Sequence, residues 1–218
     1  MRVEAVIFDF DGLLMDTEST MVGSWQHEWR FHGLDLDLES FWVPHGGDVT
    51  EQRYDRLAQA VGPDYDRQAS HARRIAYRDR LHADLPFRPG IAEWLDQAAD
   101  ANLRLAVASS SPAGWVHSHL ARVSAVTRFE VCACGDEIAD PKPSPAVYHL
   151  ALHKLDLTAE RAVAVEDTAH GVDAAHAAGL RCIAVPNPHV EVSQLQTADL
   201  TLTSARELPL RTAIARLR

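Results

Sequence analysis

The chain has 218 residues, of which 46% are hydrophobic and 24% are charged, a composition typical of a folded protein with a sizeable core. Its 31 acidic and 21 basic residues give a net charge of -10. This balance argues against nucleic acid or an anionic membrane as the partner, although a small phosphorylated molecule needs only a local basic site. No apolar run reaches the roughly 20 residues of a membrane span.

Two further features bear on the compartment. The apolar start of the chain is interrupted by Glu4, Asp9 and Asp11, so it does not predict a signal peptide. The cysteines number 3 and have no zinc-site spacing, and two of them, Cys132 and Cys134, fall on one face of a predicted strand. Small buried thiols fit this pattern better than a disulfide. We therefore expect a reducing, cytoplasmic compartment.

The first predicted element is a buried strand that begins at Ala5 and delivers two acids, Asp9 and Asp11, to a turn at Gly12. Side chains two positions apart project from the same side of a strand. Two buried like charges this close repel each other unless a cation or a proton lies between them. The pair therefore indicates a metal site or acid/base chemistry, and two solvated acids beside a turn are the alternative.

The next seventy residues contain predicted helices and loops and no convincing strand. Apolar residues at helical spacing predict a helix over 18–31, and Pro44, Gly46 and Gly47 predict a loop over 41–48. A second helix is predicted over 50–61, and Gly62 ends it. The dense, alternating charge of 64–85 predicts a long helix with a solvated surface.

Beyond a connector that contains Pro86, Pro89 and Gly90, predicted helices and strands alternate. The run 105–108 is apolar at every position, as in a parallel strand covered by helices on both faces. The predicted helices are 91–101, 113–123, 146–155 and 169–178, and the predicted strands are 103–109, 129–134, 162–165, 182–185 and 200–202.

This alternation predicts an α/β protein with a doubly wound, mostly parallel, Rossmann-like sheet. The first strand belongs to the same sheet, so residues 16–86 are an all-helical insertion after it. We expect a catalytic core made of residues 1–15 and 87–218 and a helical cap domain made of 16–86. Ligands of such sheets bind at the carboxyl ends of the strands, where the insertion leaves the core.

Hydroxyl groups follow the second strand of this sheet. Ser109, Ser110 and Ser111 come directly after an apolar run, and Pro112 opens the next helix. Hydroxyls and backbone amides at a helix N-terminus form an anion site that suits phosphate. Serine is also a common helix cap, which is the alternative interpretation.

A lysine, Lys142, lies between Pro141 and Pro143. The two prolines hold it in an extended or turn conformation, so it is not a routine charge on a helix surface. Its ammonium group would suit a transferring phosphoryl group and the carboxylate that attacks it. A solvated loop lysine is the alternative.

A second acid pair, Glu166 and Asp167, ends another apolar strand. Together with Asp9 and Asp11 on a neighbouring strand it supplies the oxygen ligands that Mg²⁺ prefers. Zinc is disfavoured, since none of the 12 histidines clusters with these acids.

The joint order of acid pair, hydroxyl, lysine and acid pair resembles the haloacid dehalogenase superfamily, in its β-phosphoglucomutase-like branch with a helical cap. The resemblance covers essentially the whole chain. Its most specific motifs are residues 9–18, which read DFDGLLMDTE, and residues 165–168, which read VEDT, with Gly171 after them. The Pro89-Gly90 and Gly179-Leu180 pairs also fit the branch.

The resemblance implies catalytic roles for the core residues. Asp9 would attack phosphorus and carry an aspartyl phosphate. Asp11 would protonate the leaving oxygen and then take a proton from water. Ser109 and the amide of Ser110 would hold phosphate oxygens, and Lys142 would pair with Asp9 and the phosphoryl group.

The resemblance also implies a Mg²⁺ site. Its ligands would be Asp9, the main-chain carbonyl of Asp11, and Asp167, with Glu166 as a direct or an indirect partner. The cation and the lysine would together offset the repulsion between phosphate and the acids.

Two activities compete within this branch. Mutases have a histidine twelve residues after the nucleophile, where this chain has Met21, and a lysine about thirteen before the cap-exit glycine, where it has Tyr77. We therefore expect a phosphatase, with a β-phosphoglucomutase-type mutase as the alternative. Dehalogenases lack the acid at Asp11. A phosphate-binding regulatory protein without activity is less favoured, because no motif residue is missing.

The expected substrate is a small phosphorylated metabolite, in the first place a sugar phosphate. His45, Arg53 and Arg74 in the cap are candidate contacts, and Arg53 is the preferred one because it lies four residues into a helix after a glycine loop. Charges on a solvated helix face are the alternative. The sequence does not predict an oligomeric state, and a monomer is compatible with it.

Overall fold

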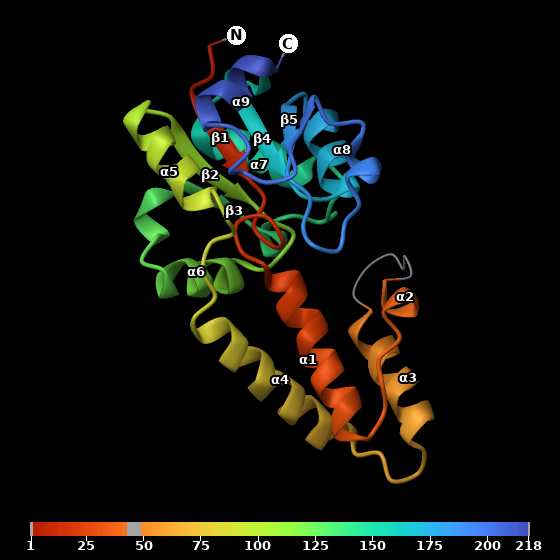
Figure 1. Ribbon diagram of the computed structural model, residues 1–218. Helices are drawn as coiled ribbons and strands as arrows, with labels where there is room; N and C mark the ends of the chain where they lie inside the picture. The colour runs from red at the N-terminus through yellow and green to blue at the C-terminus, as the bar shows by residue number, and fades with distance from the viewer. Residues whose placement is uncertain (1, 43–48, 218) are drawn as a thin grey trace. The chain divides into compact units, whose positions relative to one another are not determined.

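A parallel β-sheet forms the centre of the protein in the computed structural model, which describes residues 2–42 and 49–217 (Figure 1). Among these residues the sheet has 6 strands in the order β3-β2-β1-β4-β5-β6, so the predicted fold class is confirmed. The chain builds outward from β1 first to one side and then to the other, which places the topological switch point beside β1. The strands are β1 Ala5–Phe8, β2 Arg104–Ala108, β3 Val131–Ala133, β4 Ala162–Glu166, β5 Arg181–Ala184 and β6 Leu200–Thr201.

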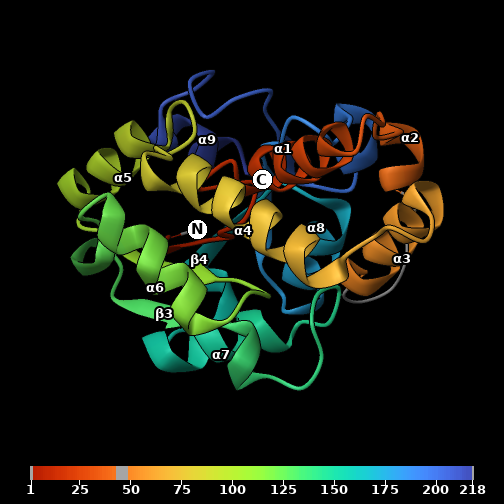
Figure 2. The same cartoon turned by 90° about the horizontal axis from the view of Figure 1, so that it is seen from below.

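Helices cover both faces of the sheet, and Figure 2 shows α9 (Leu210–Arg216) and α7 (Ala146–Leu155) on opposite sides of the strands. Alternate side chains of each strand serve the two faces. In β1, Val6 and Phe8 pack with α5 (Ile91–Asp100), α6 (Ala113–Arg122) and α9. Ala5 and Ile7 pack with α7 and α8 (Ala169–Ala177), on a face rich in alanine. The centre of the sheet is therefore buried on both sides, as its apolar runs predict.

The insertion between β1 and β2 is helical. It contains α1 (Thr17–Phe31), α2 (Leu38–Phe41), α3 (Thr50–Val61) and α4 (Arg67–Ala83). Sequence periodicity did not predict α2, which has only 4 residues and depends on a local cap, since the Asp37 side chain accepts from the Glu39 amide at 3.0 Å. It also missed α9, whose 7 residues are too few for a clear period.

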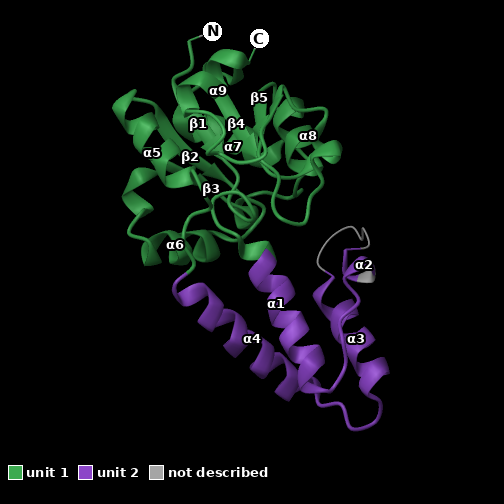
Figure 3. Cartoon of the chain, viewed as in Figure 1, with its two compact units in different colours: residues 1–18, 85–218 green, residues 19–84 purple. Residues whose placement is uncertain are grey.

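The chain divides into two compact units, residues 1–18 with 85–218 and residues 19–84 (Figure 3). We call them the core unit and the helical unit. The helical unit has an apolar centre of its own, made by Val22, Trp25, Phe41 and Tyr54. No helix in the described ranges is long and apolar enough to cross a membrane. The cysteines are free thiols, and burial raises the pKa of Cys134 to about 12.

Gly90 fixes the point where the chain enters α5. Its φ is +89°, and a Cβ there would lie 2.5 Å from the backbone of Ala205 and Arg206. Gly179 has a similar φ of +81°, but its Cβ would meet only ordinary contact, with Ala159 at 3.4 Å. The two glycines therefore share the backbone requirement and differ in the space around them.

We predict that Gly90→Ala lowers the free energy of unfolding well beyond the roughly 1 kcal/mol expected of Gly179→Ala, whose cost is only that of a left-handed backbone. Urea unfolding of both variants, followed by tryptophan fluorescence, measures the difference. Equal midpoints for the two variants would show that the approach to Ala205 and Arg206 carries no cost.

Candidate active site

The candidate site lies where three adjacent strands of the core unit end. Asp9 follows β1, Ser109 follows β2, and Glu166 is the last residue of β4. The sheet ladder continues into these ends, because the amide of Asp9 donates to the carbonyl of Val165 at 2.9 Å and that of Ser109 to Ala133 at 3.0 Å. The regular backbone therefore sets the spacing of the site residues.

Lys142 joins all three of these strand ends. Its Nζ donates to Asp9 Oδ1 at 2.5 Å, to Glu166 Oε1 at 2.6 Å and to the carbonyl of Ala108 at 2.9 Å. These acceptors match the three donors of an ammonium group, whose side chain is only 8% exposed. Burial lowers the pKa of Lys142, but the charges and hydrogen bonds of the two acids outweigh burial and raise it. Lys142 is therefore a fixed cation.

Asp9, Glu166 and Asp167 form a cluster of three buried acids. One oxygen of each lies within 4.8 Å of the others. Burial raises the pKa of Asp9 to about 8, against the effect of Lys142 and with that of Glu166. Burial, Asp9 and Glu166 likewise raise the pKa of Asp167 well above its ordinary range. One lysine does not neutralise three carboxylates, so this set of oxygens fits a hard divalent cation.

Glu166 is held by its own neighbours. Its Oε1 accepts from Lys142 and, at 2.6 Å, from the hydroxyl of Tyr148, while its Oε2 accepts from the amide of Asp167 at 3.1 Å. A Cβ on Gly171 would lie 1.9 Å from this carboxylate, so only glycine fits there. Sequence reasoning missed Tyr148, which has the spacing of a core residue on α7 and carries no further signal.

Asp167 is positioned by the loop after β5. Asn187 Nδ2 donates to Asp167 Oδ2 at 2.8 Å. Arg88 holds this loop beside the first motif, with Nη1 donating to the carbonyl of Gly12 at 2.6 Å and Nη2 to that of Pro186 at 2.8 Å. Neither Asn187 nor Arg88 was predicted, because the loop 186–188 and the connector that contains Arg88 show only turn composition in the sequence.

Gly12 brings the first motif close to the carboxylate of Asp167. Its φ is +80°, and a Cβ there would lie 2.1 Å from Asp167 Oδ2. The turn after Asp11 therefore requires glycine for both conformation and space.

Asp11 lies outside the acid cluster. Its Oδ1 accepts from Thr17 Oγ1 at 2.8 Å and from Trp115 Nε1 at 2.8 Å, and its Oδ2 accepts from Ser111 Oγ at 2.6 Å. Ser109 Oγ lies 3.5 Å from the same Oδ2. Asp9 and Asp11 are two positions apart in sequence, yet their carboxylates have different partners, and this allows them different chemistry.

The three serines differ in surroundings. Ser109 is 1% exposed, and its Oγ accepts from the amide of Ser111 at 3.0 Å. Ser110 is exposed, and its Oγ accepts from the amide of Lys142 at 3.5 Å. Ser109 thus lies at the end of β2 beside Asp11, while Ser110 links two loops of the site.

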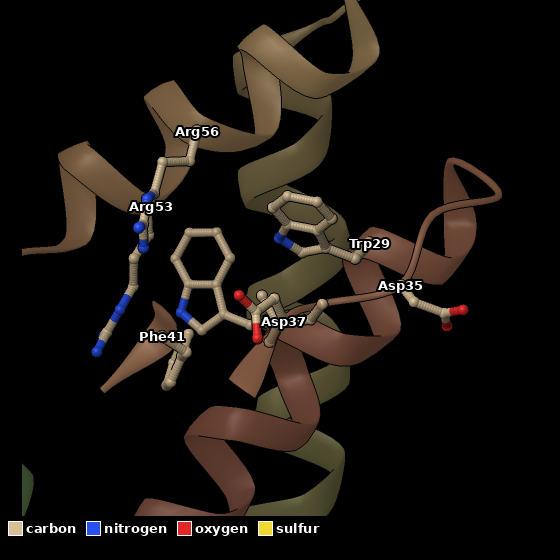
Figure 4. Close-up of a pocket in the computed structure, with 8 residues that line it drawn as sticks. Trp29, Asp35, Asp37, Phe41, Arg53 and Arg56 are labelled. Carbon is tan, nitrogen blue, oxygen red and sulfur yellow. The ribbon is translucent and has the colours of Figure 1, made fainter. Parts of the chain in front are cut away.

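The candidate substrate contacts of the insertion lie in the helical unit. Arg53 lines a cavity of about 90 Å³ within that unit, together with Arg56 on the same helix and with Trp29, Asp37 and Phe41 (Figure 4). Its guanidinium stacks over the Phe41 ring at 3.9 Å, and Nη1 lies 3.5 Å from the sulfur of Met21. His45 lies outside the described residues.

Arg74 is a packing residue of the helical unit. It is 5% exposed, and it donates to the hydroxyls of Tyr54 at 2.7 Å and Ser24 at 3.3 Å. Its guanidinium also lies 4.5 Å from the Trp25 ring. These contacts account for a buried arginine without a ligand.

The protein has a parallel sheet with a helical insertion after the first strand, and acids and a lysine meet at the strand ends. These features define an α/β enzyme with a buried carboxylate site. The family model described as haloacid dehalogenase-like hydrolase matches residues 6–185. The chain therefore belongs to this family of hydrolases, and the resemblance inferred from its motifs is confirmed.

The relatives of this chain include proteins named as phosphatases. The chain is 30% identical over 191 residues to a phosphorylated carbohydrates phosphatase of Thermotoga maritima, covering 83% of this chain and 84% of the relative. It is 35% identical to protein CbbY of Cereibacter sphaeroides, covering 94% of each chain. The crystal structure of CbbY from Rhodobacter sphaeroides in complex with phosphate matches with a TM-score of 0.70 and 33% identity, over 94% of this chain and 96% of that one. A mutant of that CbbY has been crystallised with xylulose-(1,5)bisphosphate.

We predict that the affinity for a divalent cation such as Mg²⁺ rises with pH. The folded-state pKa of Asp9, about 8, lies above its ordinary value, so a bound proton stabilises the metal-free fold at low pH and this stabilisation is lost as the pH rises through about 8. A cation at this carboxylate must displace that proton. The dissociation constant measured by calorimetry should therefore fall, by up to about tenfold per pH unit, between about pH 6 and 8.

The matched control is Asp173→Asn, which changes an exposed acid on α8 and should leave the pH dependence intact. An affinity that does not change with pH would contradict the prediction.

Proposed function

We propose that the protein is a Mg²⁺-dependent phosphatase that hydrolyses a small phosphorylated metabolite, in the first place a sugar phosphate, through an aspartyl phosphate on Asp9. One observation carries the proposal: buried Lys142 forms ion pairs with Asp9 and Glu166, next to the carboxylate of Asp167. This arrangement keeps a carboxylate nucleophile beside fixed positive charge, and such charge lowers the barrier to attack on an anionic phosphoryl group.

The first chemical step needs both acids of the first motif. As Asp9 forms a bond to phosphorus, the bond from phosphorus to the leaving oxygen breaks, and Asp11 transfers its proton to that oxygen. Ser109 and the amide of Ser110 hold oxygens of the phosphoryl group, and Lys142 offsets its charge. In the second step Asp11 takes a proton from water, which attacks phosphorus and releases Asp9.

The cation site is proposed for Asp9, Asp167 and the main-chain carbonyl of Asp11. The side chain of Asp11 is engaged by Trp115, Ser111 and Thr17, which supports the carbonyl as its contribution. Mg²⁺ at this site would supply positive charge that screens the phosphoryl group from the acids.

We assign Glu166 an indirect role at this site. Both of its oxygens accept hydrogen bonds from Lys142, Tyr148 and the amide of Asp167, so it orients the lysine and its neighbouring acid.

The substrate class rests on relatives. One is named for phosphorylated carbohydrates, and a mutant CbbY has been crystallised with a bisphosphorylated sugar. We extend this substrate class to the present chain. We also propose the division into a catalytic core of residues 1–15 and 87–218 and a cap of residues 16–86. Arg53 is the candidate substrate contact from this cap.

The mutase alternative is disfavoured by Met21. A mutase must return the phosphoryl group to a second hydroxyl, and the related mutases have a histidine at this position, whereas the thioether of Met21 cannot transfer a proton. Incubation with β-glucose 1-phosphate separates the two activities. We expect inorganic phosphate and glucose; glucose 6-phosphate as the main product would favour the mutase.

We predict that Asp9→Asn abolishes the Mg²⁺-dependent release of phosphate from an aryl phosphate and from sugar phosphates. An amide cannot form the covalent intermediate, so the loss in kcat should be on the order of 10⁵-fold. Colorimetric assay of phosphate measures it, with Asp173→Asn as the control that keeps native activity. Activity that survives Asp9→Asn rules out the proposed nucleophile.

We predict that Asp11→Asn lets the phosphorylated enzyme accumulate from an aryl phosphate. The phenolate leaves without a proton, but the base that activates water is absent, so the intermediate forms faster than it is hydrolysed. Mass spectrometry of acid-quenched protein should detect one added phosphoryl group on a peptide that contains Asp9. Its absence, alongside retained turnover, would show that Asp11 is not the base.

A further inference from the structure

The carboxylate of Asp11 is held by two kinds of donor. On Oδ1 it accepts from the indole Nε1 of Trp115 and from Thr17 Oγ1, each at 2.8 Å. On Oδ2 it accepts from Ser111 Oγ at 2.6 Å, with Ser109 Oγ 3.5 Å away. All four donors belong to the core unit. The proposed mechanism assigns nothing to Trp115.

The chemistry of these donors distinguishes the two oxygens. An indole N–H can only donate, whereas a hydroxyl can donate or accept. An oxygen with two lone pairs that already accepts from Trp115 and Thr17 has no room for a proton of its own. Oδ2 can carry a proton, because the hydroxyl of Ser111 can turn and accept from it.

Trp115 is held in place by its own helix. It lies in the first turn of α6, and its ring packs against that of His119 one turn later, with ring centres 4.2 Å apart. His119 is 1% exposed, and its Nδ1 donates to the carbonyl of Trp115 at 2.9 Å, since that carbonyl can only accept. The Phe10 ring lies edge-on to His119 at 5.9 Å. The indole N–H is therefore fixed in direction before any substrate arrives.

We propose that Trp115 is the positioning residue of Asp11: its indole N–H orients the carboxylate through Oδ1, so that Oδ2, beside Ser109 and Ser111, transfers the proton to the leaving oxygen. This inference rests on the proposed phosphatase function and names a residue of its proton transfer. In the step concerned, the O–H bond on Oδ2 breaks and one forms on the leaving oxygen, while the Asp9–phosphorus bond replaces the bond from phosphorus to that oxygen. Trp115 touches neither phosphorus nor the leaving group.

The test uses two substrates that differ in their need for a proton. The leaving group of an aryl phosphate such as 4-nitrophenyl phosphate is a stable phenolate, which needs no proton. The leaving group of an alkyl phosphate, such as glycerol 1-phosphate or a sugar phosphate, is an alcohol oxygen that must receive a proton as it departs. The parameter is kcat/KM, which reports the steps up to departure of the leaving group and not the later hydrolysis.

We predict that Trp115→Phe lowers kcat/KM for the alkyl phosphate by about 10- to 100-fold, part of the 10²–10⁴ that general acid catalysis contributes, and lowers that for the aryl phosphate by less than about threefold. A donor-retaining variant, Trp115→His, should recover part of the loss on the alkyl phosphate. It also serves as the second test if Trp115→Phe folds poorly.

The matched control is Trp94→Phe. Trp94 is a buried tryptophan of the same unit, and its Nε1 donates to a main-chain carbonyl, that of Leu208, at 2.9 Å. The Trp94→Phe variant should be less stable, because this hydrogen bond is lost, but it should keep the native ratio of the two kcat/KM values.

An equal loss on both substrates would show that Trp115 only supports the fold, and no loss on either would show that Asp11 needs no such support. Each of these results overturns the inference and leaves the proposed function intact. If the native chain releases phosphate from neither substrate with Mg²⁺ present, the proposed function fails, and this inference fails with it.

Discussion

The burial of three carboxylates around a single lysine is the constraint on which the site depends. One oxygen of each of Asp9, Glu166 and Asp167 lies within 4.8 Å of the others, and among the described residues Lys142 is the cation that forms ion pairs with two of them. Like charges removed from water raise each other's pKa, and this is the direction found for Asp9 and Asp167. Such a cluster costs stability in the free protein, and enzymes accept this cost where a ligand or cation restores the balance.

The sheet makes this cluster rigid. β1 lies between β2 and β4, and its register with both is continuous to the last residues before the acids. The face toward α7 and α8 is lined by alanines such as Ala106 and Ala164, which allow those helices to pack closely. Tyr148 on α7 therefore reaches Glu166 at the edge of the sheet. The packing of one helix thus orients an acid, a lysine and, through them, the nucleophile.

Asp9 and Asp11 have separate surroundings despite their closeness in sequence. Asp9 faces a cation, whereas Asp11 faces an indole and hydroxyl groups. Buried Phe10 lies between them in the chain, and Gly12, which follows both acids, turns the chain next to Asp167 with its positive φ. A nucleophile must be ionised and an acid must hold a proton, so two environments at one strand end are what the proposed chemistry requires.

Local sequence pattern predicts the sheet, the helical insertion, and the acids, serine and lysine at the strand ends. Apolar runs that end in polar residues specify both the strand and the edge where its chemistry lies, so Asp9, Ser109 and Glu166 were predictable from local pattern. The partners that come from distant parts of the chain became visible in the folded structure. Trp115 and Tyr148 come from helix faces whose period shows burial but not direction. A hydrogen bond between residues a hundred positions apart depends on how whole elements pack, and no local pattern records that.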